Sequence, residues 1–293
     1  MKEQFKEINF VSNSSSGFQF ECINYQDLLK KKPSDHSQFE FHKVSFYGIF
    51  LCTHNSGDYN INFKDHNFKK GTLFTLRKDN VHKFYRNNAK GLLLVFTENF
   101  VLSYSNQLEA SKTFLLFNEM LASPKLQLDE TEFKDVTTLI KLIQDEYHAA
   151  KDDHSVSIIR NFVQVIIAKL FRIKLKGNVV FENQKYLSKF LNLQALVEKE
   201  CFQYKTVTYY AKTLGVTPKT LNNITQSILN KSAKTFINEI VIIQSKRLII
   251  NSNDSLTEIA FQTGFEEPTN FFKYFKKYAG LSPSEFRASH QSA

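Results

Sequence analysis

The spacing of apolar residues changes along the chain. From about Phe39 to Phe100, short apolar or alternating runs are separated by turn signals such as HNSG and KKG. Runs of this kind, about 8 to 12 residues apart, are typical of antiparallel strands in a small sandwich or barrel. After Phe100 the period lengthens, and apolar positions from Phe133 to Tyr147 keep the spacing of an amphipathic helix. A second helix, from about Ser155 to Lys174, is apolar over more than one stripe, which predicts that it buries two faces.

A spacing of small residues recurs in the last third of the chain. Ala211 is followed by Gly215, and 49 residues later Ala260 is followed by Gly264. A small residue lets two helices cross closely, and a Gly four residues later can take the left-handed conformation of a sharp turn. The pattern therefore predicts two helix-turn-helix units. Apolar positions from Phe236 to Ile250 predict one continuous helix of about 18 residues between them.

Helix-opening signals support these boundaries. Thr217 precedes Pro218, which is the pattern of an N-cap followed by proline at the first helical position. Similar signals, either a proline at the first position or a capping box, occur at Glu267 with Pro268, at Ser255 with Glu258 and at Ser282 with Pro283 and Glu285.

Composition limits the class of protein. Hydrophobic residues make up 42% of the chain and charged residues 23%, which favours packed cores over disorder. No apolar stretch approaches the roughly 20 residues that a bilayer crossing needs, and the N-terminus lacks an apolar signal segment. We therefore expect a cytoplasmic protein without a membrane partner. The three cysteines are far apart in the sequence, which predicts reduced thiols.

Positive charge is concentrated near the C-terminus. Residues 187–293 hold 13 Lys and Arg against 8 Asp and Glu, whereas residues 1–186 hold 25 against 21. A basic domain fits a polyanionic partner such as nucleic acid. Charge alone leaves open the alternative that these lysines form an ordinary solvated surface.

The motifs of the last third resemble those of a known family. The segments SLTEIAFQTGFEEPTNFFKYFKKYAGLSPSEFR, VTYYAKTLGVTPKTLNNITQ and INEIVIIQSKRLII are similar to the DNA-binding domain of AraC-family transcription regulators. More loosely, FEFHKVSFYGIFLC and GTLFTLRKDNVHKFY resemble strand motifs of the cupin-like sensory domain in that family.

This resemblance implies a fold and its boundaries. The expected class is α+β, with an N-terminal cupin-like β-barrel that carries accessory helices. The C-terminal domain is expected to be all-α, with two helix-turn-helix units joined by a linker helix. The implied boundaries are residues 1–176 for the ligand-sensing and dimerisation domain, 177–186 for a linker and 187–293 for the DNA-binding domain.

In the family, base contacts come from the exposed face near the start of the second helix of each unit. The matching positions are Lys219, Asn222 and Asn223 in the first unit, and Thr269, Asn270 and Lys273 in the second. Helical spacing agrees for the first unit, because residues 219, 222 and 223 share one face. Asparagine can bond adenine through two atoms, so an adenine-rich target is expected. The alternative for each residue is an ordinary solvated side chain.

Three positions depart from the family pattern. Asn223 stands where an Arg is common, and Thr225 stands where a Phe is common, so the first unit is expected to bind DNA less strongly or to pack differently. Pro268 replaces a polar base-contacting residue, which leaves it only a steric role.

Other positions are candidates for the DNA backbone or for the core. The candidate phosphate contacts are Thr217, Lys231, Lys234, Lys276 and Lys277. Phe265, Phe271, Phe275, Tyr278, Leu281 and Phe286 have helical spacing, which predicts a core and not a platform for stacking bases.

Two histidines in the strand-rich region fall where metal cupins place ligands. At the remaining ligand positions after His42 the chain has Val44 and Gly48, so His42 and His82 lack the carboxylate and third imidazole that such a site needs. We therefore expect no metal and no cofactor. The histidines are either hydrogen-bonded strand residues or polar groups of a ligand pocket, for which the candidates are His42, Tyr47 and His82.

The leading prediction is a transcription regulator that binds a double-stranded DNA operator and responds to a small-molecule effector. A homodimer is expected through the helix at residues 155–174, unless both of its apolar stripes are buried within one subunit. RNA polymerase is a further candidate partner. Two alternatives belong to other classes: an enzyme, either a metal-dependent cupin or a cysteine-based DNA repair methyltransferase, fused to a DNA-binding domain, and an architectural DNA-binding protein without a ligand. No catalytic motif can be assigned, so we expect no enzyme.

Overall fold

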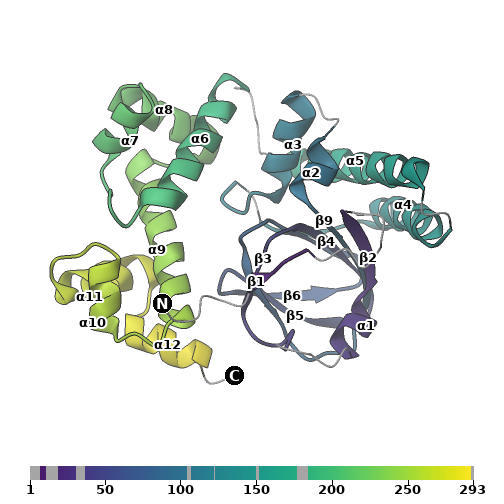
Figure 1. Cartoon of the computed structure of the whole chain (residues 1–293), viewed down its shortest axis with the longest axis horizontal. Coiled ribbons are helices and arrows are strands. Elements are labelled where there is room, and N and C mark those ends of the chain that lie inside the picture. The colour runs from purple at the N-terminus through teal and green to yellow at the C-terminus, as the bar shows by residue number, and fades with distance from the viewer. Residues whose placement is uncertain are drawn as a thin grey trace. The chain divides into compact units, whose positions relative to one another are not determined.

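The computed structural model describes residues 7–10, 19–30, 37–103, 107–121, 123–149, 152–176 and 184–291. The chain divides near residue 180 into an N-terminal and a C-terminal compact unit, coloured purple to teal and green to yellow in Figure 1. Most of the predicted linker, residues 177–183, lies outside the described residues.

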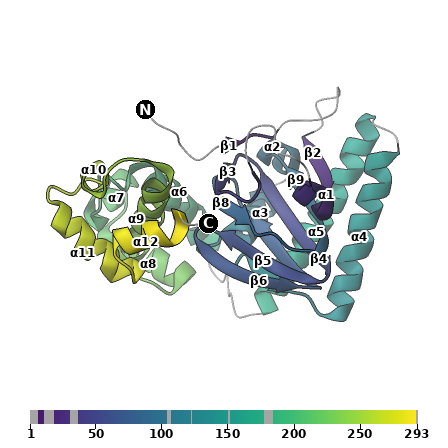
Figure 2. The same ribbon diagram turned by 90° about the horizontal axis from the view of Figure 1, so that it is seen from below.

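Two five-stranded sheets form the N-terminal unit (Figures 1 and 2). One sheet has the order β1-β3-β8-β5-β6, and the other has the order β10-β7-β4-β9-β2. Its strands are β1 Glu7–Ile8, β2 Phe20–Asn24, β3 His42–Val44, β4 Tyr47–His54, β5 Ser56–Ile61, β6 Lys64–Lys69, β7 Thr72–Leu76, β8 Val81–Phe84, β9 Lys90–Phe96 and β10 Lys125–Gln127. Its helices are α1 Tyr25–Lys30, α2 Glu98–Leu102, α3 Gln107–Phe117, α4 Glu130–His148 and α5 Asp153–Lys176.

The predicted strand-rich domain and its two long helices are confirmed. Neighbouring strands pair antiparallel except for β1 and β3, which pair in parallel. Strand β6 does not stand out as an apolar run in the sequence, since only two of its six side chains are buried. A two-residue turn at Asn62 and Phe63 joins β5 to β6, and both residues have the positive φ that a type I′ turn requires.

The N-terminal unit contains two hydrophobic cores. One lies between the sheets and is rich in aromatic rings, among them those of Tyr25, Phe50 and Tyr59. The other lies between the second sheet and the helices, where Ile49 and Leu51 pack in one cluster with side chains of α4 and α5. Strand β4 therefore contributes alternate side chains to both cores, which explains why nearly all its residues are buried.

The C-terminal unit is entirely helical within the described residues, as predicted. Its helices are α6 Gln184–Glu200, α7 Val207–Thr213, α8 Pro218–Leu229, α9 Ala233–Asn251, α10 Leu256–Gln262, α11 Pro268–Ala279 and α12 Pro283–Gln291. Helix α9 has 19 residues and is the predicted linker helix. It contributes the largest set of buried residues in this unit, so the two helix-turn-helix units, α7 with α8 and α10 with α11, are built around it.

Candidate nucleic-acid interface

The turns of the two helix-turn-helix units have the predicted geometry. Ala211 and Ala260 are buried, and Gly215 and Gly264 have φ values of +62° and +74°. These positive φ values are favourable for glycine and costly for other residues. Both turns therefore depend on the small residues that recur in the sequence.

Helix α8 presents one polar face to solvent. Thr217 is its N-cap, with the hydroxyl oxygen accepting a hydrogen bond from the Thr220 N–H, and Pro218 occupies the first position. Leu221 and Ile224 are buried, whereas the predicted base-contacting residues Lys219, Asn222 and Asn223 are exposed. Thr225 is also fully buried, so it occupies the core position where the family commonly has a Phe.

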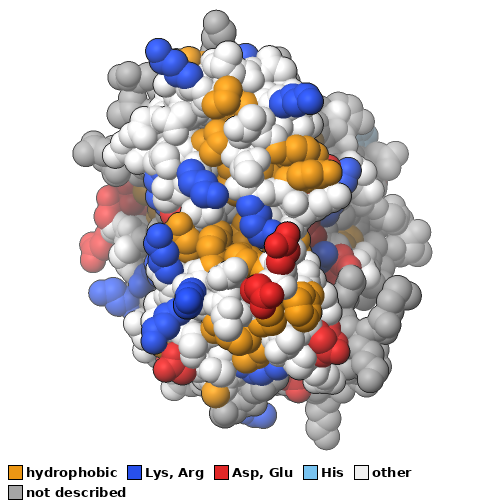
Figure 3. Space-filling model, turned by 90° about the vertical axis from the view of Figure 1, so that its left-hand side faces the viewer, with side chains coloured by type: hydrophobic (Ala, Val, Ile, Leu, Met, Phe, Trp, Pro, Cys, Tyr) orange, Lys and Arg blue, Asp and Glu red, His pale blue; other side chains and the backbone are white. Residues whose placement is uncertain are grey.

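Helix α11 has the same design in the second unit. Phe271 and Phe275 are buried against the domain, and Thr269, Asn270 and Lys273 are exposed. Helices α8 and α11 carry four lysines between them and no acidic residue. Figure 3 views the side on which both helices lie in Figure 1. It shows Lys and Arg side chains spread over this face, with apolar patches and a smaller number of Asp and Glu side chains between them. Such a face can attract a polyanion and still present amides to base edges.

One predicted base contact has an additional role. The Oδ1 atom of Asn222 accepts a hydrogen bond from the N–H of Ala233, 3.1 Å away in the first turn of α9. Reading adenine through two atoms requires both the oxygen and the amino group of the side chain. Asn222 must therefore break this hydrogen bond before it can read adenine through two atoms, although its side chain is exposed like those of Asn223 and Asn270.

The candidate phosphate contacts differ in their surroundings. Lys231 forms an ion pair with Glu239, whose two carboxylate oxygens lie 2.7 and 3.0 Å from its Nζ atom. Lys234 donates to the carbonyl oxygen of Lys205 at 3.2 Å. Lys276 and Lys277 are exposed in the last turn of α11. The positive charge of Lys231 is thus partly compensated.

The aromatic set of the second unit is only partly a core. Phe271, Phe275 and Phe286 are buried, as predicted. Tyr278 is 39% exposed and Leu281 is also exposed, so the prediction of a core position was wrong for these two. Helical spacing predicted a place on the apolar face for both, but Tyr278 lies in the last turn of α11 and Leu281 lies beyond its end.

The candidate pocket residues of the N-terminal unit do not form one group. His42 and His82 are register partners on β3 and β8, with ring centroids 4.1 Å apart. The Nδ1 atom of His82 is hydrogen-bonded to the Tyr59 hydroxyl at 3.1 Å. Tyr47 instead packs against Phe117 in the core between sheet and helices. Tyr59 was missed, although the alternation of DYNINF places its side chain on one face of a strand.

Burial controls the chemistry of this histidine pair. Desolvation, and secondarily the neighbouring His42, lowers the pKa of His82 well below its usual value. His42 is anchored by a hydrogen bond between its Nδ1 atom and the carbonyl oxygen of Glu40. Among the described residues, no group of three or more His, Cys, Asp or Glu side chains is arranged to hold a metal ion.

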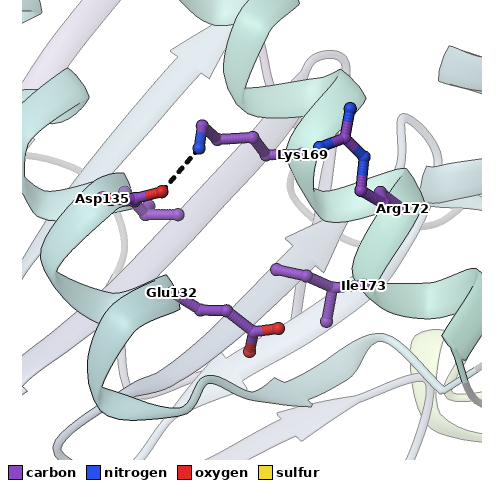
Figure 4. A pocket seen from close by; sticks show the side chains of 6 residues that line it. Glu132, Asp135, Lys169, Arg172 and Ile173 are labelled. Carbon is purple, nitrogen blue, oxygen red and sulfur yellow. Dashed lines mark hydrogen bonds and ion pairs between the residues drawn. The ribbon is translucent and has the colours of Figure 1, made fainter.

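A shallow pocket lies between α4 and α5 (Figure 4). It is lined by Glu132, Asp135, Val136, Lys169, Arg172 and Ile173. Lys169 donates to Asp135 at 2.6 Å across the pocket. Because two acidic and two basic side chains line it, the pocket has no net charge with which to select an ion.

Within the described residues, none of the helices combines the length and the hydrophobicity needed to cross a membrane.

Comparisons with known proteins agree with the helix-turn-helix geometry. Residues 210–289 match a family described as a helix-turn-helix domain. YisR of Bacillus subtilis, named as an uncharacterized HTH-type transcriptional regulator, is 37% identical over 62 residues, which is 21% of this chain and 22% of that protein. The chain thus spans about a fifth of this relative. The transcriptional activator RhaS of Escherichia fergusonii is 22% identical over 87% of this chain and 90% of its own.

The solved structures that are similar to this chain include ToxT from Vibrio cholerae O395. It is 13% identical, with a TM-score of 0.44, over 94% of this chain and 99% of that one. The paired helix-turn-helix units and these matches show that the C-terminal part of the chain is a helix-turn-helix domain similar to those of transcription regulators.

Proposed function

We propose that this protein is a sequence-specific transcription regulator that binds double-stranded operator DNA through α8 and α11. The observation that carries the proposal is the pair of amphipathic second helices, each with a buried apolar face and an exposed polar face without acidic residues. Lys219, Asn222, Asn223, Thr269, Asn270 and Lys273 are the proposed base-contacting residues. Asn222 is assigned a weaker contact than Asn223, because its oxygen is already bonded to α9.

The DNA backbone is the second part of the proposed interface. The N-cap Thr217 and the lysines Lys231, Lys234, Lys276 and Lys277 are the proposed phosphate contacts. Each lysine that neutralises a phosphate releases counterions, so the logarithm of the binding constant should fall by about 0.9 per contact for each tenfold rise in salt.

The test uses the full chain. Fragments selected from random-sequence DNA should converge on a common site, and filter binding across a salt series should show a steep linear loss of affinity. A flat salt response, or selection without convergence, would contradict the proposal.

We also propose that the protein acts as a homodimer through α5. Ile159 of α5 is fully buried, whereas Val165, about 120° away around the same helix, is 44% exposed. Together with Ile158 and Leu142, it makes up half of the six exposed large apolar side chains of the described residues. This distribution favours a second copy of the chain as the partner over burial of both stripes in one subunit. A twofold axis would pair the same patch on both copies.

The N-terminal domain is the proposed site of effector binding. His42 and His82 are candidate contacts, and the Nε2 atom of His82 is buried without a hydrogen-bond partner within the described residues. An unpaired buried nitrogen is costly, and a polar ligand atom would satisfy it. An unbiased thermal-shift screen of small molecules tests this point, and a hit whose shift is lost in His82→Phe would support it. Cytoplasmic location and a contact with RNA polymerase are further parts of the proposal.

A further inference from the structure

The second helix-turn-helix unit meets the loop that precedes the first unit at a junction within the C-terminal domain. Lys205, in the loop that leads into α7, donates to the carbonyl oxygen of Phe202 at 2.7 Å and to that of Gly264 at 3.3 Å. Its Nζ atom also lies 5.0 Å from the ring centroid of Phe265, which follows the turn of the second unit. One side chain thus connects the loop before the first unit to the turn of the second.

The backbone itself is in close contact at this junction. A Cβ atom added to Gly264 would lie 2.1 Å from the carbonyl oxygen of Phe202, which is far inside van der Waals contact. Glycine is therefore required at position 264 both for its positive φ and for this approach. The turn of the second unit cannot move closer to the loop between α6 and α7, because the two backbones are already in contact.

The linker helix contributes a second anchor at this junction. Asn238 of α9 is 2% exposed, and its Nδ2 atom donates to the Tyr278 hydroxyl at 2.8 Å. Its Oδ1 atom accepts from the Tyr274 hydroxyl at 3.0 Å. The Tyr274 ring also contacts Phe265, with centroids 5.2 Å apart. Both polar atoms of Asn238 are therefore used to hold α11.

The two tyrosines lie close to the proposed base-reading face. Tyr274 and Tyr278 follow Asn270 at intervals of four residues, so they run along the border between the exposed and the buried face of α11. A rotation of α11 about its axis would have to break the bonds to Asn238. The same rotation would move Asn270 away from its place on the exposed face.

We infer that Asn238 is a positioning residue for DNA recognition, which fixes the rotation of α11 so that both units read their subsites at one spacing. Lys205 and Gly264 support the same arrangement from the loop side. The inference rests on the proposed function. Its distinctive consequence is that loss of Asn238 weakens the preference for one spacing of the two subsites, and not only the strength of binding.

The experiment compares full-length variants on DNA sites selected with the unmodified protein. One or two base pairs are inserted between the two subsites, and each inserted pair rotates the second subsite by about 35° around the duplex. The unmodified protein should lose about tenfold or more in affinity on insertion, as for one mismatched contact. Asn238→Ala should bind the native site less well and lose less than threefold on insertion.

A matched control removes a different polar group from the same helix. Ser245 is also fully buried on α9, but its hydroxyl bonds within the helix, to the carbonyl oxygen of Val241. Ser245→Ala should keep the insertion penalty of the unmodified protein. Tyr278→Phe, which removes one partially exposed hydroxyl, provides a milder second variant if Asn238→Ala does not fold. Tyr278→Phe should also reduce the loss of affinity that the inserted base pairs cause.

Two outcomes are informative in opposite ways. If Asn238→Ala and Tyr278→Phe weaken binding to all spacings by the same factor, the residue is merely structural and the inference is overturned. If the unmodified protein itself selects no sites, the proposed function has failed, which is a different result from an unchanged insertion penalty.

Discussion

The side-chain oxygen of Asn222 accepts a hydrogen bond from the backbone N–H of Ala233, so the exposed face of α8 is bonded to the first turn of α9. Asn222 and Asn223 are neighbours of identical chemistry, and both are exposed. We expect their roles to differ, because Asn222 stabilises the contact between α8 and α9 whereas Asn223 faces solvent.

Asn222→Ala should therefore lower the free energy of unfolding by about 1 kcal/mol, the usual contribution of one hydrogen bond. Asn223→Ala should leave the stability of the domain nearly unchanged and alter base preference instead. Urea unfolding and selection on randomised sites measure the two effects. Equal losses of stability in the two variants would contradict this division of roles.

Base contacts and phosphate contacts on α11 should separate by mutation. Asn270→Ala should relax base preference at one position, with a cost of about 1 to 3 kcal/mol on the selected site. Lys276→Ala should weaken binding to every sequence by a similar factor and reduce the salt dependence by about one contact. Identical selection profiles for the two variants would show that the faces of α11 are assigned wrongly.

The ion pair of Lys231 with Glu239 predicts a variant that binds DNA more tightly than the unmodified protein. Glu239→Gln removes the compensating charge, so Lys231 becomes available to a phosphate, and non-specific DNA binding should become tighter and more sensitive to salt. Filter binding on random DNA measures the change. The double variant Lys231→Ala with Glu239→Gln should not show the gain, and a gain that persists there would come from another lysine.

Substitutions on the two stripes of α5 should have different effects. Ile159→Glu places a carboxylate in the core between sheet and helices and should unfold the N-terminal domain. Val165→Glu places it on an exposed face and should give a folded monomer with weaker operator binding. Light scattering and circular dichroism distinguish these outcomes. A monomeric unmodified protein at micromolar concentration would end the dimer proposal.

Lys174 predicts a pH dependence of stability. Its Nζ atom donates to the carbonyl oxygen of Leu116 at 2.5 Å, and burial lowers its pKa to about 8, against a smaller opposing effect of Glu119. Below pH 8 both folded and unfolded chains carry the proton, so the cost of burying the charge is fully present. From about pH 8 toward the ordinary value of 10.5, the folded chain loses its proton first, and the free energy of unfolding gains a rising contribution.

The measurement compares urea unfolding of the unmodified protein with that of Lys174→Met between pH 7 and 10. The free energy of unfolding of the unmodified protein, minus that of Lys174→Met, should rise as the pH rises. Other groups titrate equally in both proteins, so their effects cancel in this difference. Parallel curves would show that Lys174 does not titrate in this range.

The sequence was sufficient to predict elements that depend on local rules. Gly215 and Gly264 predicted sharp turns because few other residues tolerate a positive φ, and Thr217 predicted a helix start because a hydroxyl can cap it. The pairing of Gly264 with the Phe202 carbonyl was not predictable, since it joins residues far apart in the chain. The hydrogen bond of Asn222 to Ala233 was not predictable either, since it depends on how α8 packs against α9.

Tyr47 shows a second limit of sequence patterns. A strand with one buried face alternates between apolar and polar residues, which tells the two faces apart. Strand β4 is buried on both faces, so its sequence YGIFLC carries no such alternation. Its side chains could be assigned to the barrel interior or to the helices only from the fold, and Tyr47 belongs with the helices.

The double burial of β4 also makes it a mechanical link. Phe50 packs among the aromatic rings between the sheets, while its neighbours Ile49 and Leu51 pack against the layer that contains α4 and α5. Close-packed interiors transmit displacements because they contain few voids that could absorb them. A small molecule that bound between the sheets and displaced Phe50 would also shift Ile49 and Leu51, and with them the side chains of α5 in the same cluster. Binding between the sheets would therefore move the exposed Val165 face of α5 through the backbone of β4.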